Sequence, residues 1–241
     1  MRIGAHVSPA TAPTSGADQA ASSPQSVPVI AIDGPTASGK GTVAQQVARE
    51  LGFACLDSGA LYRIVGLLAL ERGIDLDDAA GLAALATDLR PMFQDGQVLL
   101  EGRDISAAIR REDVGRAASH VAALGPLRKA LLALQRAQRR SPGLVADGRD
   151  MGTVVFPDAC LKIYLQADVR VRAERRLKQL MEKGYSANLA DLLQTLQERD
   201  RRDQTRDCSP LVAAEDAKVL DSTALTVEEV VARVLQWYRS L

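Results

Sequence analysis

Aromatic residues, histidine and cysteine are all scarce in this sequence of 241 residues. Aromatic residues make up 3% of the chain and hydrophobic residues 46%, so the core must be built largely from aliphatic side chains. Two histidines and three widely separated cysteines, Cys55, Cys160 and Cys208, have no metal-ligand spacing and do not indicate a zinc site. Isolated thiols in odd number fit a reducing cytosol, so we expect a cytoplasmic protein.

The chain also lacks an excess of charge of either sign. Thirty Lys and Arg residues balance thirty Asp and Glu residues, and the isoelectric point is near 6.7. This balance argues against binding to nucleic acid or to a membrane surface, so any basic site must be local. The apolar runs are too short to span a bilayer, and no apolar stretch near the N-terminus suits a signal peptide. We expect a monomer.

Residues 1–26 are rich in Ala, Ser, Pro and Thr and show no hydrophobic periodicity. This composition predicts a flexible tail outside the fold. The folded domain is then expected over residues 27–241.

One stretch, residues 28–51, organises the rest of the domain. The apolar run Val29–Ile32 predicts a buried strand, and a helix follows with Val43, Val47 and Leu51 on one face. Between them lie two glycines, which let the backbone N–H groups approach an anion, and a lysine that can reach the β and γ phosphates. The order strand, glycine-framed loop and helix indicates a P-loop for a nucleoside triphosphate, formed by Gly34, Pro35, Thr36, Ala37, Ser38, Gly39, Lys40, Gly41 and Thr42.

The loop departs from the usual P-loop pattern at one position. The residue after Lys40 is normally Ser or Thr, whereas here it is Gly41, and Thr42 follows one place later. Direct coordination of Mg²⁺ by a loop hydroxyl is therefore open, with Thr42 as the candidate. The plainer alternative is a tight turn that only joins strand to helix.

Five short apolar segments separated by helices predict an α/β fold with a doubly wound, mostly parallel sheet. The strands are expected at Val29–Ile32, Phe53–Leu56, Leu144–Ala146, Leu161–Leu165 and Lys218–Leu220. Helices are expected at 40–51, 61–70, 112–124, 127–140, 168–183 and 188–202, with a last one capped by Thr226 and Glu229 that buries Val230, Val234 and Trp237. Gly125 is expected to end one helix and Pro126 to open the next.

Residues 73–111 interrupt this alternation and are expected to form an insert. A helix is indicated over 78–89, and two short apolar runs flank Asp95-Gly96, which is a hairpin signal.

In a sheet of this kind, ligands bind beyond the carboxyl ends of the strands. Asp57-Ser58-Gly59 follows the second strand and Asp147-Gly148-Arg149-Asp150 follows the third. Asp147 occupies the place where P-loop enzymes hold Mg²⁺, usually through water. The structural alternatives are that Asp57 and Ser58 cap a helix and that Asp150 caps a turn.

Arginine is the second indication of an anionic ligand. Several arginines fall in or beside the expected site, and bidentate contact with phosphate favours this residue. The alternative for the run Glu198–Asp203 is a solvated helix face, which we expect for about half of its members. The arginines are Arg63, Arg128, Arg149, Arg175, Arg176, Arg199, Arg202 and Arg206.

The motifs together resemble bacterial cytidylate kinases, of the nucleoside monophosphate kinase family. The resemblance covers residue 27 to the end and rests on Gly34–Thr42, Leu56–Arg63, Ala146–Pro157 and Glu198–Asp203. In that family Lys-Gly-Thr is the usual end of the P-loop. The resemblance implies a core, a nucleotide-monophosphate insert at 73–111 and a helical lid at 168–207.

The resemblance also implies roles at matching positions. The P-loop would bind ATP with Mg²⁺, and Lys40, Arg149 and Arg199 would be catalytic. CMP or dCMP would be bound through phosphate, ribose and base by Ser58, Arg63, Ser119, Arg128, Asp147, Arg149, Asp150, Arg199, Asp203 and Arg206. Within that set, Asp203 would take the ribose hydroxyls, and Ser119, Arg128 and Asp150 would read cytosine.

Three other functions are alternatives to this interpretation. A GTPase switch would need a guanine-reading Asn-Lys-x-Asp motif, which the sequence lacks. A kinase of UMP or of a shikimate-like acid also uses arginines, although the 147–150 motif and the insert disfavour the acid. A silent nucleotide-binding module is disfavoured by the presence of Lys40 and Asp147.

Overall fold

A computed structural model describes Met1 and residues 27–94, 97–182 and 184–241. The predicted tail, apart from Met1, and the predicted turn at Asp95-Gly96 lie outside the described residues. Within the described ranges, no helix is long and apolar enough to cross a membrane.

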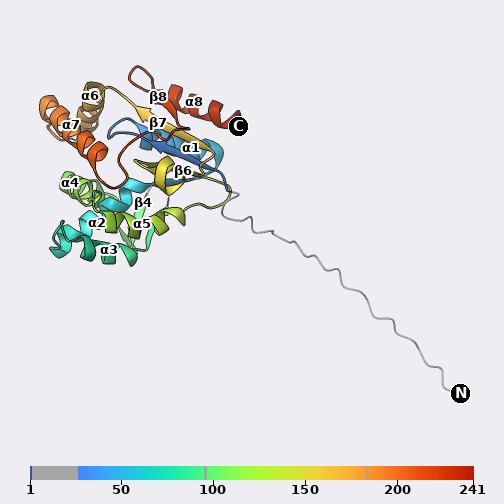
Figure 1. The fold of residues 1–241 in the computed structure, drawn as a ribbon, viewed down its shortest axis with the longest axis horizontal. Helices are drawn as coiled ribbons and strands as arrows, with labels where there is room; N and C mark the ends of the chain where they lie inside the picture. The colour runs from blue at the N-terminus through green and yellow to red at the C-terminus, as the bar shows by residue number, and fades with distance from the viewer. Residues whose placement is uncertain (2–26, 95–96, 183) are drawn as a thin grey trace.

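A five-stranded parallel sheet forms the centre of the molecule, as predicted (Figure 1). Its strand order is β2-β6-β1-β7-β8, so the strand that leads into the P-loop lies in the middle. Ile32 of that strand stands beside Asp147 and Ile163 of its two neighbours. The carboxyl ends of β1 and β6 therefore meet at one edge of the sheet. The strands are β1 (Val29–Asp33), β2 (Ala54–Asp57), β6 (Leu144–Gly148), β7 (Leu161–Gln166) and β8 (Lys218–Asp221).

Two apolar clusters cover the two faces of this sheet. Val29 and Ala31 of β1 belong to one cluster and Ile30 and Ile32 to the other, because successive side chains of a strand point to opposite faces. All five residues of β1 are buried, which explains why its sequence is continuously apolar up to Asp33.

Helices pack on both faces, as a doubly wound fold requires. α1 (Lys40–Leu51) and α8 (Val227–Arg239) supply the helical side chains that pack in one cluster. α2 (Ser58–Arg72), α4 (Glu112–Val121) and α5 (Gly125–Arg136) contribute to the other, together with side chains of segments 73–111 and 151–159. The capping box of Thr226 and Glu229 is confirmed.

Segment 73–111 contains one strand more than the sequence indicated. α3 (Ala79–Thr87) is followed by the antiparallel pair β3 (Pro91–Gln94) and β4 (Gln97–Leu100), as predicted. β5 (Arg103–Asp104) adds a third strand, and a 3₁₀ turn, η2 (Ala108–Arg110), leads into α4. A two-residue strand of charged residues has no hydrophobic alternation that could have revealed it.

Two charged helices, α6 (Val169–Glu182) and α7 (Leu189–Thr205), pack against each other at one end of the molecule, near α4 (Figure 1). The Asn188 side chain caps α7 by accepting from the N–H of Ala190. These helices correspond to the predicted pair at 168–183 and 188–202.

Some boundaries differ from the sequence-based expectations. α2 begins at Ser58 rather than Leu61, because Asp57 caps it and accepts from the N–H of Ala60. Gly125 begins α5 instead of ending the helix before it, and α5 ends at Arg136. Trp237 is only partly buried.

Asp33 joins the end of β1 to the loop that follows β6. Its two carboxylate oxygens accept from the N–H groups of Met151 and Gly152, both at 2.8 Å. Those residues start a π-helical turn, η3 (Met151–Val155), which the sequence did not predict. Asp33 therefore positions the loop that carries Arg149 and Asp150.

Asp33 should make stability depend on pH. Burial raises the pKa of its carboxyl from 3.8 to about 6. The folded protein then keeps this proton more readily than the unfolded chain, so the contribution to stability is complete below about pH 4 and is lost as pH rises through about 6. A difference of roughly two pK units corresponds to about 3 kcal/mol.

We expect the wild type to lose stability relative to Asp33→Asn between pH 4 and pH 7. Urea denaturation of both proteins across this range, without nucleotide, measures the difference. If the difference in the free energy of unfolding between the two proteins does not change with pH, Asp33 titrates at the same pH in the folded and unfolded chains.

Candidate active site

A cavity of about 230 Å³ opens where β1, β2 and β6 end. All ten residues expected to bind the acceptor line it, from α2, α4, α5, β6, α7 and the segments that directly follow β6 and α7. The structure thus brings together side chains that are nearly 150 positions apart in the chain. Segment 73–111 supplies none of the described residues that line this cavity.

The lining carries more positive than negative charge although the whole chain is neutral. Acidic side chains lie among the basic ones and pair with several of them. An excess of cations in a partly enclosed site favours an anionic ligand. The basic residues are Lys40, Arg63, Arg128, Arg149, Arg199 and Arg206, and the acidic ones are Asp57, Asp147, Asp150 and Asp203.

The P-loop has the backbone that a phosphate cradle requires. Gly39 has φ +93°, a conformation that L side chains rarely adopt. A Cβ on Gly34 would lie 2.0 Å from the carbonyl oxygen of Leu165, so the loop passes directly against β7. The ammonium of Lys40 donates to the carbonyl oxygen of Pro35 at 3.0 Å and lies 4.0 Å from Asp147.

Lys40 and Asp147 form a buried pair of opposite charge. Burial lowers the pKa of Lys40 and raises that of Asp147, and their mutual attraction opposes both shifts. The neighbouring charge of Arg149 lowers the pKa of Lys40 further. Ligand phosphates would keep Lys40 charged by adding negative charge beside it.

Gly41 explains the departure from the usual P-loop sequence. A Cβ at this position would lie 3.0 Å from Oδ2 of Asp147. A serine or threonine here would therefore crowd that carboxylate. Thr42 is exposed and faces the opposite side of the loop, in a second cavity.

This second cavity, of about 550 Å³, lies on the other side of the P-loop. It is lined by Ala37–Thr42 together with side chains of α6 and of the segment from β8 to α8. Ala37 and Lys40 line both cavities, so the lysine stands where the two meet. The second cavity is also lined by Arg175, which the sequence indicated as a possible phosphate ligand. Lys178 and Ser222 line it too, and the sequence did not indicate them as site residues.

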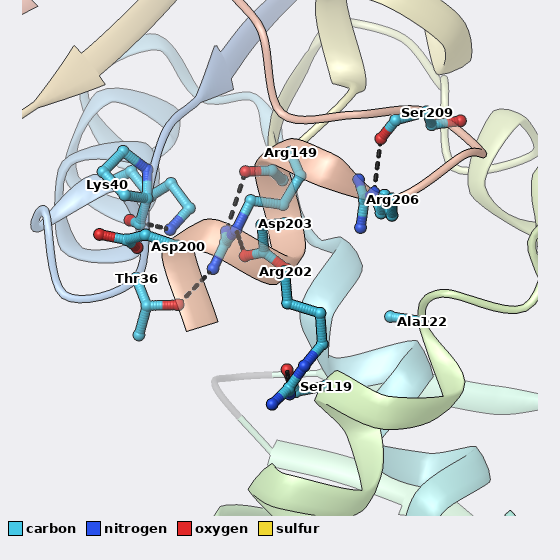
Figure 2. A network of polar contacts seen from close by, with 12 residues as sticks. Thr36, Lys40, Ser119, Ala122, Arg149, Asp200, Arg202, Asp203, Arg206 and Ser209 are labelled. Carbon is cyan, nitrogen blue, oxygen red and sulfur yellow. Dashed lines mark hydrogen bonds and ion pairs between the residues drawn. The ribbon is translucent and has the colours of Figure 1, made fainter. Parts of the chain in front are cut away.

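Arg149 connects the P-loop to α7. Its guanidinium donates to the hydroxyl of Thr36 at 2.7 Å and to Oδ2 of Asp203 at 3.0 Å (Figure 2). Burial alone would raise the pKa of Asp203, but Arg149 and Arg199 hold it below its usual value. Asp203 is therefore ionised at neutral pH.

Arg128 and Asp150 form a second buried pair that lines the same cavity. Arg128 donates to Asp150 and, at 3.0 Å, to the carbonyl oxygen of Ala122. Its guanidinium lies 5.4 Å from the centre of the Tyr62 ring, which sequence analysis did not place in the cavity lining. The Asp150 side chain thus binds Arg128. It makes no capping hydrogen bond to the turn that follows, so the structural alternative for Asp150 is wrong.

α7 supplies Arg199 and Asp203, one helical turn apart, and Arg206 follows directly after the helix ends at Thr205. Nε of Arg199 and one terminal nitrogen of Arg206 are buried and have no hydrogen-bond partner among the described residues. Burial, together with the nearby charge of Arg149, lowers the pKa of Arg199 to about 10. Unsatisfied cationic donors of this kind favour an incoming anion.

Half of the members of the 198–203 run lie on the solvent side, as the alternative interpretation expected. Glu198, Arg201 and Arg202 are exposed. Arg202 nevertheless reaches the hydroxyl of Ser119 on α4 at 2.8 Å (Figure 2). Arg63 donates to the carbonyl oxygen of Ile109 at 2.9 Å, which ties the insert to the cavity wall.

Comparison with known proteins agrees with this geometry. The family described as Cytidylate kinase matches residues 30–240. Cytidylate kinase from Burkholderia cenocepacia is 58% identical over 214 residues, which cover 89% of this chain and 94% of that protein. Cytidylate kinase from Paraburkholderia phymatum is 57% identical with the same coverage. A shikimate kinase structure from Acinetobacter baumannii is far more distant, with 17% identity, a TM-score of 0.43 and coverage of 90% and 95% of the two chains. The chain belongs to the cytidylate kinase family.

Proposed function

We propose that the two cavities bind the two substrates of one reaction, the transfer of a phosphoryl group from ATP to CMP or dCMP. The observation that carries this proposal is that Lys40 lines both cavities, at the point where they meet. ATP would occupy the larger cavity with its phosphates on the P-loop, and CMP the basic one. Membership of the cytidylate kinase family makes a GTPase switch or a shikimate-like kinase the weaker interpretation.

The acceptor phosphate would be held by Ser58, Arg63, Arg149, Arg199 and Arg206. All five line the basic cavity, and three of these arginines are supported by neighbouring carboxylates or carbonyl oxygens. Guanidinium groups can contact phosphate with two parallel hydrogen bonds, so they fix its orientation as well as neutralising its charge. Asp203, which is ionised beside Arg149, would accept from a ribose hydroxyl.

The base would be read by Asp150, Arg128 and Ser119. The buried pair Arg128–Asp150 presents a carboxylate that can accept from the exocyclic amine of cytosine. Uracil has a carbonyl at that position and would face the carboxylate with a second acceptor. The Ser119 hydroxyl is held by Arg202 at the same wall of the cavity.

The reaction needs no general base, because the attacking oxygen belongs to a phosphate that is already anionic. That oxygen forms a bond to the γ phosphorus, the bond to the oxygen bridging β and γ breaks, and ADP leaves. Lys40, Arg149 and Arg199 would neutralise the charge on the transferred group and hold donor and acceptor in line. α6 and α7, within the proposed lid at 168–207, would exclude water.

The residues around Asp147 fit a Mg²⁺ ion. Its Oδ1 is buried without a hydrogen-bond partner in the described chain, and Gly41 leaves space beside Oδ2. Mg²⁺ is usually held by one or two carboxylates together with waters and substrate phosphates, so a single aspartate suffices. Asp147, through water, and Thr42 from the donor side are the candidate holders. The ion would supply charge neutralisation to the β and γ phosphates of ATP.

Removal of the amine at the junction of the cavities should abolish transfer. We expect Lys40→Ala to fold and to lose at least about a hundredfold in kcat, the order found when one preorganised transition-state donor is deleted. An ADP-release assay with ATP and CMP measures the loss, and Lys129→Ala, on the exposed side of α5, is the control. Activity of Lys40→Ala within a few-fold of the control would rule out the kinase proposal.

Asp150→Asn should change the choice of base. An amide in place of the carboxylate leaves a mismatched buried group against cytosine, at a cost of about 1–3 kcal/mol. We expect roughly a ten- to hundredfold fall in the ratio of kcat/KM for CMP over UMP. Because the change also removes the charge that faces Arg128, thermal stability is measured alongside.

Arg63→Ala serves as the comparison for base choice. It removes a phosphate contact common to both nucleotides, so kcat/KM for CMP and UMP should fall together. If the CMP to UMP ratio is unchanged in Asp150→Asn, the base is read by other residues and Asp150 only supports Arg128.

A further inference from the structure

Arg172 on α6 is a buried arginine that lines neither cavity. It is 5% exposed, and its guanidinium makes three contacts. It donates to the carbonyl oxygen of Ala167 after β7 at 2.9 Å, to that of Thr36 in the P-loop at 3.1 Å, and to Oδ2 of Asp200 on α7 at 2.6 Å. One side chain therefore joins the sheet, the P-loop and the lid.

Arg149 makes a second connection between the P-loop and α7. It donates to the hydroxyl of Thr36 and to Asp203, whereas Arg172 takes the Thr36 carbonyl and Asp200. Asp200 and Asp203 are three positions apart on α7 and lie on neighbouring parts of one helix face. The P-loop residue Thr36 is thus connected to α7 through two arginine–aspartate pairs. Figure 2 shows the first of them, Arg149 between Thr36 and Asp203.

The two arginine–aspartate pairs differ in whether they line a cavity where a ligand could reach them. Arg149 and Asp203 line the acceptor cavity, so substrate would compete for them. Arg172 lines neither cavity, and Asp200 is absent from the lining residues described for both, so their pair can persist when the site fills. Because Arg199 directly precedes Asp200 on α7, the placement of Asp200 also sets where the Arg199 side chain begins.

We propose that Arg172 and Asp200 are a positioning pair for phosphoryl transfer, which fixes α7 against the P-loop so that Arg199 and Asp203 face the acceptor phosphate. The planar fork of arginine is required, because lysine cannot donate to three acceptors in these directions from one rigid plane. Neither residue touches the reacting atoms. The inference rests on the proposed function and concerns the same site.

A double-mutant cycle tests the pair. Arg172→Met, Asp200→Asn and the double variant are compared with wild type by kcat and KM for ATP and CMP, well below each melting temperature. Each single change breaks the same link, so we expect each to lower kcat roughly tenfold or more, with the double variant no worse than the more damaged single variant. KM for ATP should change by less than about threefold, since the donor cavity keeps its lining.

Stability has to be separated from positioning. Removing one partner of a buried pair is destabilising, whereas replacing both with uncharged groups often restores stability. A double variant that melts near wild type but keeps the loss in kcat supports positioning. A double variant with wild-type kcat would overturn the proposal. If Arg172→Met does not fold, Asp200→Asn alone decides, and a wild-type kcat in that variant would overturn the proposal as well.

The matched control lies on the same helix two residues away. Arg170 pairs with Glu174 at 3.4 Å, and both side chains are exposed, so Arg170→Met and Glu174→Gln remove a pair of the same chemistry. We expect both to keep kcat within about twofold. Arg172→Lys, which keeps the charge without the fork, should behave like Arg172→Met.

Hydrogen exchange gives a readout that does not depend on catalysis. In Arg172→Met we expect faster exchange in residues 34–39 and 189–205 than in wild type or Arg170→Met. Unchanged exchange in both segments would overturn the positioning proposal even if activity falls. A wild-type protein that fails to phosphorylate CMP would instead overturn the proposed function and leave the exchange result interpretable.

Discussion

The candidate active site depends on a balance between buried cations and a smaller set of carboxylates. Lys40, Arg128 and Arg149 each lie beside one aspartate, from β6, the loop after it, or α7. Cations gathered in a partly enclosed volume repel one another, as the pKa of Arg199, lowered by burial and by Arg149, shows. The aspartates allow the site to form before an anionic ligand arrives, and they also fix the directions in which the guanidinium groups point.

The core of the fold could be predicted from the sequence because its signals are local. A continuous apolar run, two glycines and an amphipathic helix specify β1, the P-loop and α1, and the structure confirms them. The remaining sheet strands follow from short apolar runs, and α8 follows from its capping box. β5 and the π-helical turn at Met151–Val155 were missed, because one has no apolar pattern and the other depends on hydrogen bonds from the distant Asp33.

Within the site, motif resemblance identified residues that periodicity could not. Ser119 and Arg128 stand on ordinary amphipathic helices, and only the fold brings their side chains to the cavity. Arg172 and Asp200 were not predicted, since each lies in a run of charged residues that suggests a solvated surface. Their burial arises when α6 and α7 pack together beside the P-loop, a long-range arrangement that the local sequence does not encode.

If Arg149 binds the acceptor phosphate as proposed, substrate capture is an exchange of partners at the Arg149–Asp203 pair. The phosphate would have to displace Asp203 from Arg149 or share the guanidinium with it, so the gain in binding free energy would be the difference between two ionic contacts. Such a site can fix the orientation of a phosphate while binding it with only moderate affinity. On release of the diphosphate product, the Asp203 carboxylate would pair with Arg149 again, so that the guanidinium would not be left buried without a counter-charge.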